Sequence, residues 1–114
     1  MLHEMTLFPR PYASIASGQK TIELRLYDEK RQSIHIGDQI QFTNTEDASQ
    51  TTLCEVVQLH VFKDFRDLYE KLPLLQCGYT SEDVDNAHPD DMLTYYSKEK
   101  QAQYGVVGIE LKRI

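Results

Sequence analysis

Three charged side chains that could do chemistry together lie close to one another near the front of the chain: Lys20, Glu23 and Arg25. An ammonium group can hold a phosphate or carbonyl oxygen, a carboxylate can accept hydrogen bonds from amino groups of a base, and a guanidinium can orient a planar ligand. A lysine beside a carboxylate can also transfer protons in catalysis. The alternative interpretation is a solvent-facing strand with cross-strand ion pairs, which stabilise a fold only weakly.

An alternating segment must position these charges. From Thr21 to Tyr27 the apolar residues recur with a period of two, which is typical of a β-strand with one buried face. One face carries Ile22, Leu24 and Leu26, and the other carries Thr21, Glu23, Arg25 and Tyr27. Lys20 has the parity of the apolar face. It can therefore join Glu23 only if the chain bends near Gly18, the glycine expected to end a short helix that begins at Pro11.

Tyrosines are the second group with chemical potential. The chain has seven tyrosines and no tryptophan, and Tyr95, Tyr96 and Tyr104 all lie in the segment before the last strand. Tyrosine rings can stack on nucleic acid bases, although half-buried packing is the alternative for each of them. Tyr104 directly precedes the glycine that opens the last strand, so we expect it to be a stacking surface.

Other kinds of site lack support. The four histidines have no metal-ligand spacing, the two cysteines form no C-x-x-C motif, and no serine has the context of a hydrolase nucleophile. Phosphate-binding and dinucleotide-binding glycine motifs are absent. The acidic residues between 82 and 91 lack the pattern of a calcium loop and are expected to face solvent. We therefore expect neither a metal nor a cofactor.

Length and charge limit the kind of partner. A chain of 114 residues fits one domain, residues 1–114, and has no apolar run long enough to cross a membrane. No secretion signal is recognisable at the N-terminus, so we expect a cytoplasmic protein without a membrane partner. The net charge is −6, yet residues 1–36 hold five basic and four acidic side chains while the rest hold seven and fourteen. A nucleoside, nucleotide or short single strand suits this distribution better than a duplex, whose binding needs many phosphate contacts. The oligomeric state cannot be predicted.

The expected elements give an α+β fold in which strands outweigh helices. We predict strands at 3–8, 21–27, around Ile40 and Phe42, at 51–62 with a bulge, and from Gly105 onward. Asp64 should cap a helix that Pro73 stops, a further short helix should start at Pro89, and residues 28–31 should form a charged loop. Because the strands do not alternate regularly with helices, an antiparallel barrel is favoured over a parallel sheet.

The motif Gly-x-Lys-Thr-x-Glu-x-Arg at 18–25, followed by Gly-Asp-x-Ile-x-Phe at 37–42, resembles the ASCH domain, a branch of the PUA-like superfamily. The resemblance implies a small PUA-like antiparallel β-barrel with short flanking helices and a ligand cleft beside the motif. It implies a partner that is RNA, a nucleotide or a modified nucleoside. The residues expected to bind that ligand are Lys20, Thr21, Glu23, Arg25 and Tyr104.

One bacterial branch of that family hydrolyses N(4)-acetylcytidine with a lysine base, a threonine nucleophile three residues later and a distal glutamate. Lys20 matches the lysine, but Glu23 stands where that branch has threonine, and the distal glutamate has no secure match. The alternative function is therefore an amidohydrolase for N-acylated nucleosides in which Lys20 and Glu23 are catalytic and activate a water molecule. A third interpretation is an interaction module without a small ligand.

Overall fold

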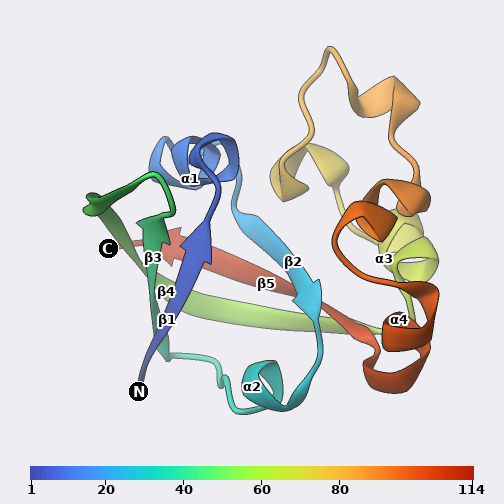
Figure 1. Ribbon diagram of the computed structural model, residues 1–114, viewed down its shortest axis with the longest axis horizontal. Helices are drawn as coiled ribbons and strands as arrows, with labels where there is room; N and C mark the ends of the chain where they lie inside the picture. Colours follow the sequence, from blue (N-terminus) through green and yellow to red (C-terminus); the bar gives the residue numbers. More distant parts are fainter.

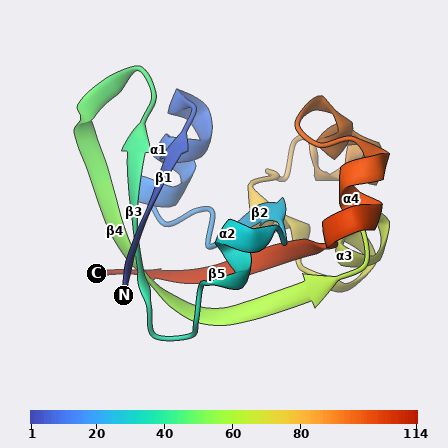
Figure 2. The ribbon, with the colours of Figure 1, turned by 60° about the horizontal axis from the view of Figure 1, so that its bottom comes forward.

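The computed structural model describes residues 1–114 and contains one five-stranded sheet (Figure 1). The strands are β1 (Leu2–Leu7), β2 (Ile22–Leu26), β3 (Gln39–Asn44), β4 (Asp47–Phe62) and β5 (Val106–Arg113). Their order across the sheet is β1-β3-β4-β5-β2. Strand β4 is the longest and curves beneath the molecule toward α3 (Figure 2). The sheet is a half-barrel, as expected for a PUA-like α+β fold.

Short helices flank the sheet. They are α1 (Pro9–Ala16), α2 (Glu29–Gln32), α3 (Phe65–Lys71) and α4 (Lys98–Tyr104), with three 3₁₀ helices, η1 (Leu74–Cys77), η2 (Val84–Asn86) and η3 (Pro89–Thr94). The predicted cap of α3 is confirmed, because the Asp64 carboxylate accepts a hydrogen bond from the Asp67 amide at 2.9 Å. None of the helices combines the length and the apolar character that a membrane crossing requires.

The sheet is mostly antiparallel, as expected, but one pair of strands is parallel. Strand β1 runs parallel to β3, from Leu2 opposite Gln39 to Leu7 opposite Asn44, whereas the other pairs are antiparallel. A parallel pair needs a long crossover connection, and here α1, β2 and α2 supply it. The crossover also places β1 and β2 at the two open edges of the sheet.

The predicted bulge in the long strand is confirmed. The register of β4 against β5 shifts between Val56 and Gln58. An extra residue on one strand increases local twist and bends the strand, which matches the curvature of β4 in Figure 2. The first part of β4 pairs with β3 and the later part pairs with β5.

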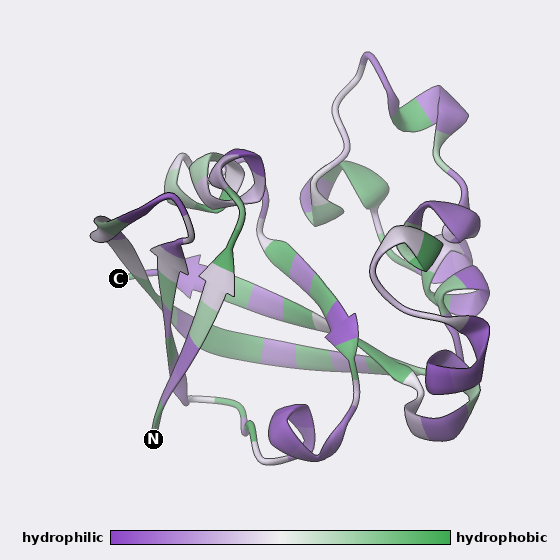
Figure 3. Cartoon of the chain, in the orientation of Figure 1, coloured by the Kyte–Doolittle hydropathy of each residue, from purple (hydrophilic) through white to green (hydrophobic).

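Two apolar clusters pack against this sheet. The first lies between the sheet and α1 and includes Ile15, Phe42 and Ile109. The second joins β2 to α3 and to the 3₁₀ helices η1 and η3, and includes Leu24 and Leu68. Alternating apolar and polar residues along β2 are visible in Figure 3. The predicted apolar face of β2 therefore packs in the second cluster and leaves its polar face toward β1 and α1.

Two short helices are not among the elements that the sequence predicts. Residues 28–31 are not a loop, because Asp28 caps α2 by accepting from the Arg31 amide at 3.1 Å. Residues 98–104 form α4, where Ser97 accepts from the Lys100 amide at 3.2 Å. Both helices are mostly polar and lack the apolar periodicity that predicts a helix.

Candidate functional site

The chain bends at Lys20, as the proximity of Lys20 to Glu23 requires. Strand β2 begins only at Ile22. Before it, the Lys20 amide donates to the Ser14 carbonyl at 3.0 Å, and the Thr21 amide donates to the Gln76 carbonyl at 2.9 Å. These two bonds hold the backbone outside strand geometry, so the alternation of faces does not extend to Lys20.

Glu23 is the centre of a charged triad. Its side chain is buried, with 4% of the residue exposed. One carboxylate oxygen, Oε1, lies 2.7 Å from Lys20 Nζ, and the other, Oε2, accepts from Arg25 Nε at 2.8 Å. The structure thus brings together the three charged residues that the sequence singles out.

The triad carries formal charges although it is buried. Burial alone would raise the pKa of Glu23, but Lys20 and Arg25 outweigh it, so the pKa lies below its ordinary value. Burial likewise acts to lower the pKa of Arg25, and the Glu23 carboxylate reverses that effect and raises it. Two cations around one carboxylate leave a local charge of +1. Ion pairs that are withdrawn from water gain little net stability, because each charge loses its hydration.

Arg25 also connects the two open edges of the half-barrel. Its Nη2 donates to the carbonyl oxygen of Thr6 in β1 at 3.1 Å. The edges β1 and β2 share no ladder of backbone hydrogen bonds. The triad therefore lies at the seam where a closed barrel would have its last pair of strands.

A cavity of about 560 Å³ opens at this seam, and all three triad residues line it. Its other walls come from the end of β1 with the start of α1, from α3, and from the segment that runs from Cys77 to Tyr96. The lining is mixed, with apolar and aromatic side chains beside the charges. This combination is typical of sites that bind small organic molecules.

Aromatic side chains form the wall and the rim of the cavity. Tyr69, Tyr79, Tyr95 and Tyr96 all line it. The Tyr96 ring stacks on Phe65 with 5.9 Å between centroids, and burial raises the pKa of its phenol. Phe8 and Tyr95 also line the cavity, yet 59% and 58% of these residues are exposed. Two large aromatic side chains thus remain exposed to solvent at this cavity.

Two residues of the predicted ligand set lie elsewhere. Thr21 does not line the large cavity, and its hydroxyl donates to the Gln76 side chain at 3.4 Å. Tyr104, the predicted stacking surface, is also absent from its walls. It ends α4 and packs against the second apolar cluster, with Lys100 Nζ 5.7 Å from its ring centroid. Tyr95 occupies the exposed position expected for Tyr104.

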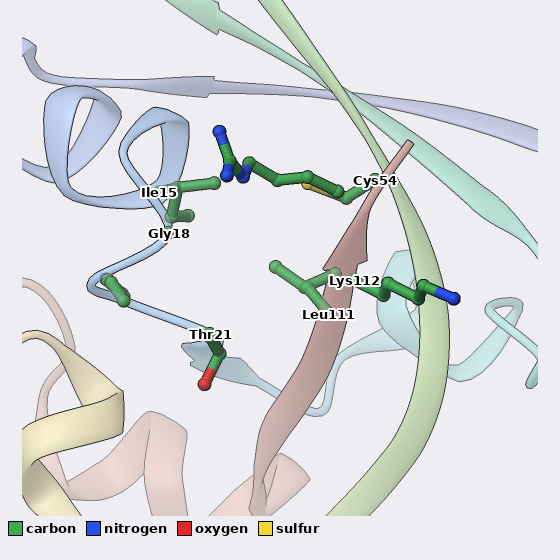
Figure 4. A pocket seen from close by; sticks show the side chains of 8 residues that line it. Ile15, Gly18, Thr21, Cys54, Leu111 and Lys112 are labelled. Atoms are coloured by element: carbon green, nitrogen blue, oxygen red, sulfur yellow. The ribbon is translucent and has the colours of Figure 1, made fainter.

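A smaller pocket of about 360 Å³, drawn in Figure 4, shares Lys20 with the large cavity. Thr21 and Gly18 line it together with Cys54 and Leu111. The Lys112 side chain points away from Ile15 and Gly18 in this view. The Arg113 guanidinium is already engaged with the carbonyl oxygen of Ala16. The smaller pocket therefore offers fewer free polar groups than the large cavity.

The thiols and the candidate metal ligands do not add a reactive centre. Cys54 and Cys77 are both free and buried. Burial raises the pKa of Cys77, which lines the large cavity, to about 11. A thiol that stays protonated is a weak nucleophile. No group of three or more histidine, cysteine, aspartate or glutamate side chains is arranged to hold a metal ion.

Comparison with known proteins identifies the family. The family model for the ASCH domain matches residues 5–114. The hypothetical protein PH0355, known from a crystal structure, is 32% identical, with a TM-score of 0.82 and full coverage of both chains. PF0455 from Pyrococcus furiosus is also 32% identical, with a TM-score of 0.76 and coverage of 100% of this chain and 98% of that one.

A more distant structure supports the fold alone. The ASCH protein from Zymomonas mobilis is 14% identical, with a TM-score of 0.68, and the match covers 97% of this chain and 66% of that one. Among curated protein sequences, none matches this chain. The span that the family model matches, residues 5–114, includes the whole triad and every residue that lines the large cavity. The chain therefore belongs to the ASCH domain family.

Proposed function

We propose that this protein binds RNA or a nucleoside-like ligand in the cavity at the open seam of its half-barrel. The observation that carries the proposal is the buried triad of Lys20, Glu23 and Arg25 in a cavity rimmed by exposed aromatic rings. The cations can hold phosphate or carbonyl oxygens, and the carboxylate can accept from amino groups. The rings of Phe8 and Tyr95 can stack on a base.

The size and charge of the site favour a small ligand. A volume of about 560 Å³ lies within the range of sites for small molecules and cofactors. Three cations, Arg10, Lys20 and Arg25, line the cavity, but Glu23 already pairs with two of them. Such a site supports binding of a nucleoside, a nucleotide or a short single strand. It does not supply the many phosphate contacts on which duplex binding depends.

The first test is a binding measurement with matched lysine variants. Lys20→Ala removes a triad cation and should weaken the binding of nucleoside monophosphates by about tenfold or more, since hydrogen bonds to charged groups contribute about 1.5–3 kcal/mol. Lys63→Ala removes an exposed lysine outside the cavity and should leave affinity unchanged. Equal affinity of both variants and the wild type would contradict the proposal and favour an interaction module.

An amidohydrolase is the second candidate, because Lys20 and Glu23 line the same cavity and could hold a water molecule against an amide. Binding has stronger support. The cations that lower the pKa of Glu23 also make its carboxylate a weaker base.

A panel of N-acylated nucleosides that includes N(4)-acetylcytidine distinguishes the two candidates. Hydrolysis by the wild type that is lost in both Lys20→Ala and Glu23→Ala, with folding retained, would establish an enzyme and locate its site. Without wild-type turnover, the hydrolase candidate fails for these substrates.

A further inference from the structure

A chain of hydrogen bonds in the cavity wall fixes the direction of two phenol groups. The hydroxyls of Tyr69 and Tyr79 lie 2.6 Å apart, and the Tyr79 hydroxyl donates to Asp91 Oδ2 at 2.7 Å. The same carboxylate oxygen accepts from the His88 amide at 3.2 Å. Asp91 is thereby anchored at the start of η3. All three members of the Tyr69–Tyr79–Asp91 chain line the large cavity.

The direction of each proton follows from the inventory of donors. An ionised carboxylate can only accept, so Tyr79 must give its single proton to Asp91. Tyr79 then has none left for Tyr69, and the bond between the two hydroxyls must run from Tyr69 to the Tyr79 oxygen. The Tyr69 proton is consumed as well. Its oxygen keeps a free lone pair and can only accept a further hydrogen bond.

Both phenols keep their protons at neutral pH. Burial raises the pKa of Tyr69 to about 12, and burial together with the hydrogen bonds to Tyr69 and Asp91 raises the pKa of Tyr79 as well. The polarity of the chain is therefore constant over the physiological range. Lys20 and Arg25 line the same cavity and can only donate. The lining thus combines an obligate acceptor with obligate donors.

We infer that the Tyr69–Tyr79–Asp91 chain makes Tyr69 an obligate hydrogen-bond acceptor that selects amino-bearing bases over their oxo counterparts. The inference rests on the proposed nucleoside-binding function and adds the class of ligand. An amino group facing Tyr69 completes its hydrogen bonds. A carbonyl at the same position sets two acceptors against each other and leaves both unpaired, which is costly in a buried site.

The test compares pairs of ligands that differ only at this group. Cytidine and uridine monophosphate form one pair, and adenosine and inosine monophosphate form the other. Wild-type protein should bind the amino member of at least one pair about tenfold more tightly.

Tyr79→Phe frees the Tyr69 proton, so the Tyr69 hydroxyl can then donate. In this variant the oxo member should gain affinity and the preference should fall to about twofold or less. Tyr69→Phe should weaken only the amino member. Tyr27→Phe, which removes a hydroxyl outside the cavity, should keep the wild-type preference.

The outcomes separate this inference from the proposed function. Equal binding of both members by the wild type would overturn the inference and leave nucleoside binding intact. Equal weakening of both members in Tyr79→Phe would also overturn it, because a merely structural tyrosine would give that result. Binding of no nucleotide at all would overturn the proposed function and this inference with it. Thermal unfolding of each variant verifies that the comparison is made on folded protein.

Discussion

At the residue scale, the central feature is a carboxylate shared between two cations. Glu23 satisfies both Lys20 and Arg25 in a place that water hardly reaches. The three side chains depend on one another, because removal of the single negative charge leaves two buried positive charges side by side. Breaking such a group by removing one partner costs far more than the intact group contributes.

Glu23→Gln should therefore destabilise the protein by about 3 kcal/mol, the range expected when a buried charge loses its partner. Urea denaturation at neutral pH measures the loss. Glu55→Gln is the matched control, since Glu55 is an exposed carboxylate on β4 and its loss should change stability by less than about 0.5 kcal/mol. Equal effects of the two substitutions would contradict the view that Glu23 compensates the charge of the two buried cations.

The same carboxylate should make stability depend on pH in the acid range. The pKa of Glu23 is lower in the folded protein than in the unfolded chain. Its stabilisation is therefore complete above the unfolded value of about 4.3 and is lost as the pH falls through the folded value. The stability difference between wild type and Glu23→Gln should be constant near neutral pH and should shrink below about pH 4. A difference that grows on acidification would contradict a lowered pKa.

At the element scale, the turn into the last strand is held by a glycine that no other residue can replace freely. Gly105 has a φ of 72°, and a Cβ atom there would lie 2.9 Å from the carbonyl oxygen of Phe62. Gly37 also has a positive φ, of 94°, but nothing lies within 4 Å of its Cβ position. A residue other than glycine would be strained by the backbone conformation at both positions, but only at position 105 would its Cβ atom also clash.

Gly37→Ala should thus cost about 1 kcal/mol, from the left-handed backbone alone. Gly105→Ala should cost about 3 kcal/mol, because the clash with backbone adds to that strain. Thermal unfolding of both variants compares them directly. A similar loss for both would show that the approach of β5 to Phe62 relaxes without cost.

The sequence alone predicts only those helices and strands that carry strong local signals. The alternation along β2 predicts both its buried face and its charged face, and the Asp64 cap predicts the start of α3. Helices α2 and α4 lack apolar periodicity, so nothing local distinguishes them from loops. The parallel pairing of β1 with β3 depends on the path of the crossover between them, which no single segment encodes.

The residues of the candidate site also differ in whether the sequence alone could predict them. Lys20, Glu23 and Arg25 are close in sequence and could be grouped without a structure. The aromatic wall could not, since its residues come from the position before α1, from α3 and from the segment 77–96. Tyr79 and Tyr95 of that segment line the cavity, while Tyr104 packs against the second apolar cluster.

At the scale of the whole molecule, the site is a consequence of incomplete closure. A closed barrel would pair β1 with β2, but here one arginine side chain spans the seam. Unpaired strand edges are a liability for most proteins and are usually covered or blocked. In this fold, residues of the segment 77–96 and of α1 line the cavity at the seam together with the triad.

The charge of the whole protein limits how strongly salt should affect binding. The net charge is −6, and Arg10 is the single lining cation outside the triad. Binding of a nucleoside monophosphate should weaken with salt, with a slope of log K against log salt no steeper than about −2. Titrations between about 50 and 200 mM salt measure the slope. A slope steeper than about −4 would indicate an extended phosphate-binding surface elsewhere on the protein.

The central claim is that the seam cavity is the ligand site. Its most direct test is an amide NMR titration of the wild-type protein with a nucleoside monophosphate. The account predicts shifts that saturate and that cluster on residues lining the cavity, with Lys20, Glu23, Arg25, Tyr79 and Tyr95 among them. Saturable shifts that cluster on another face, or no saturable shifts at all, would contradict it.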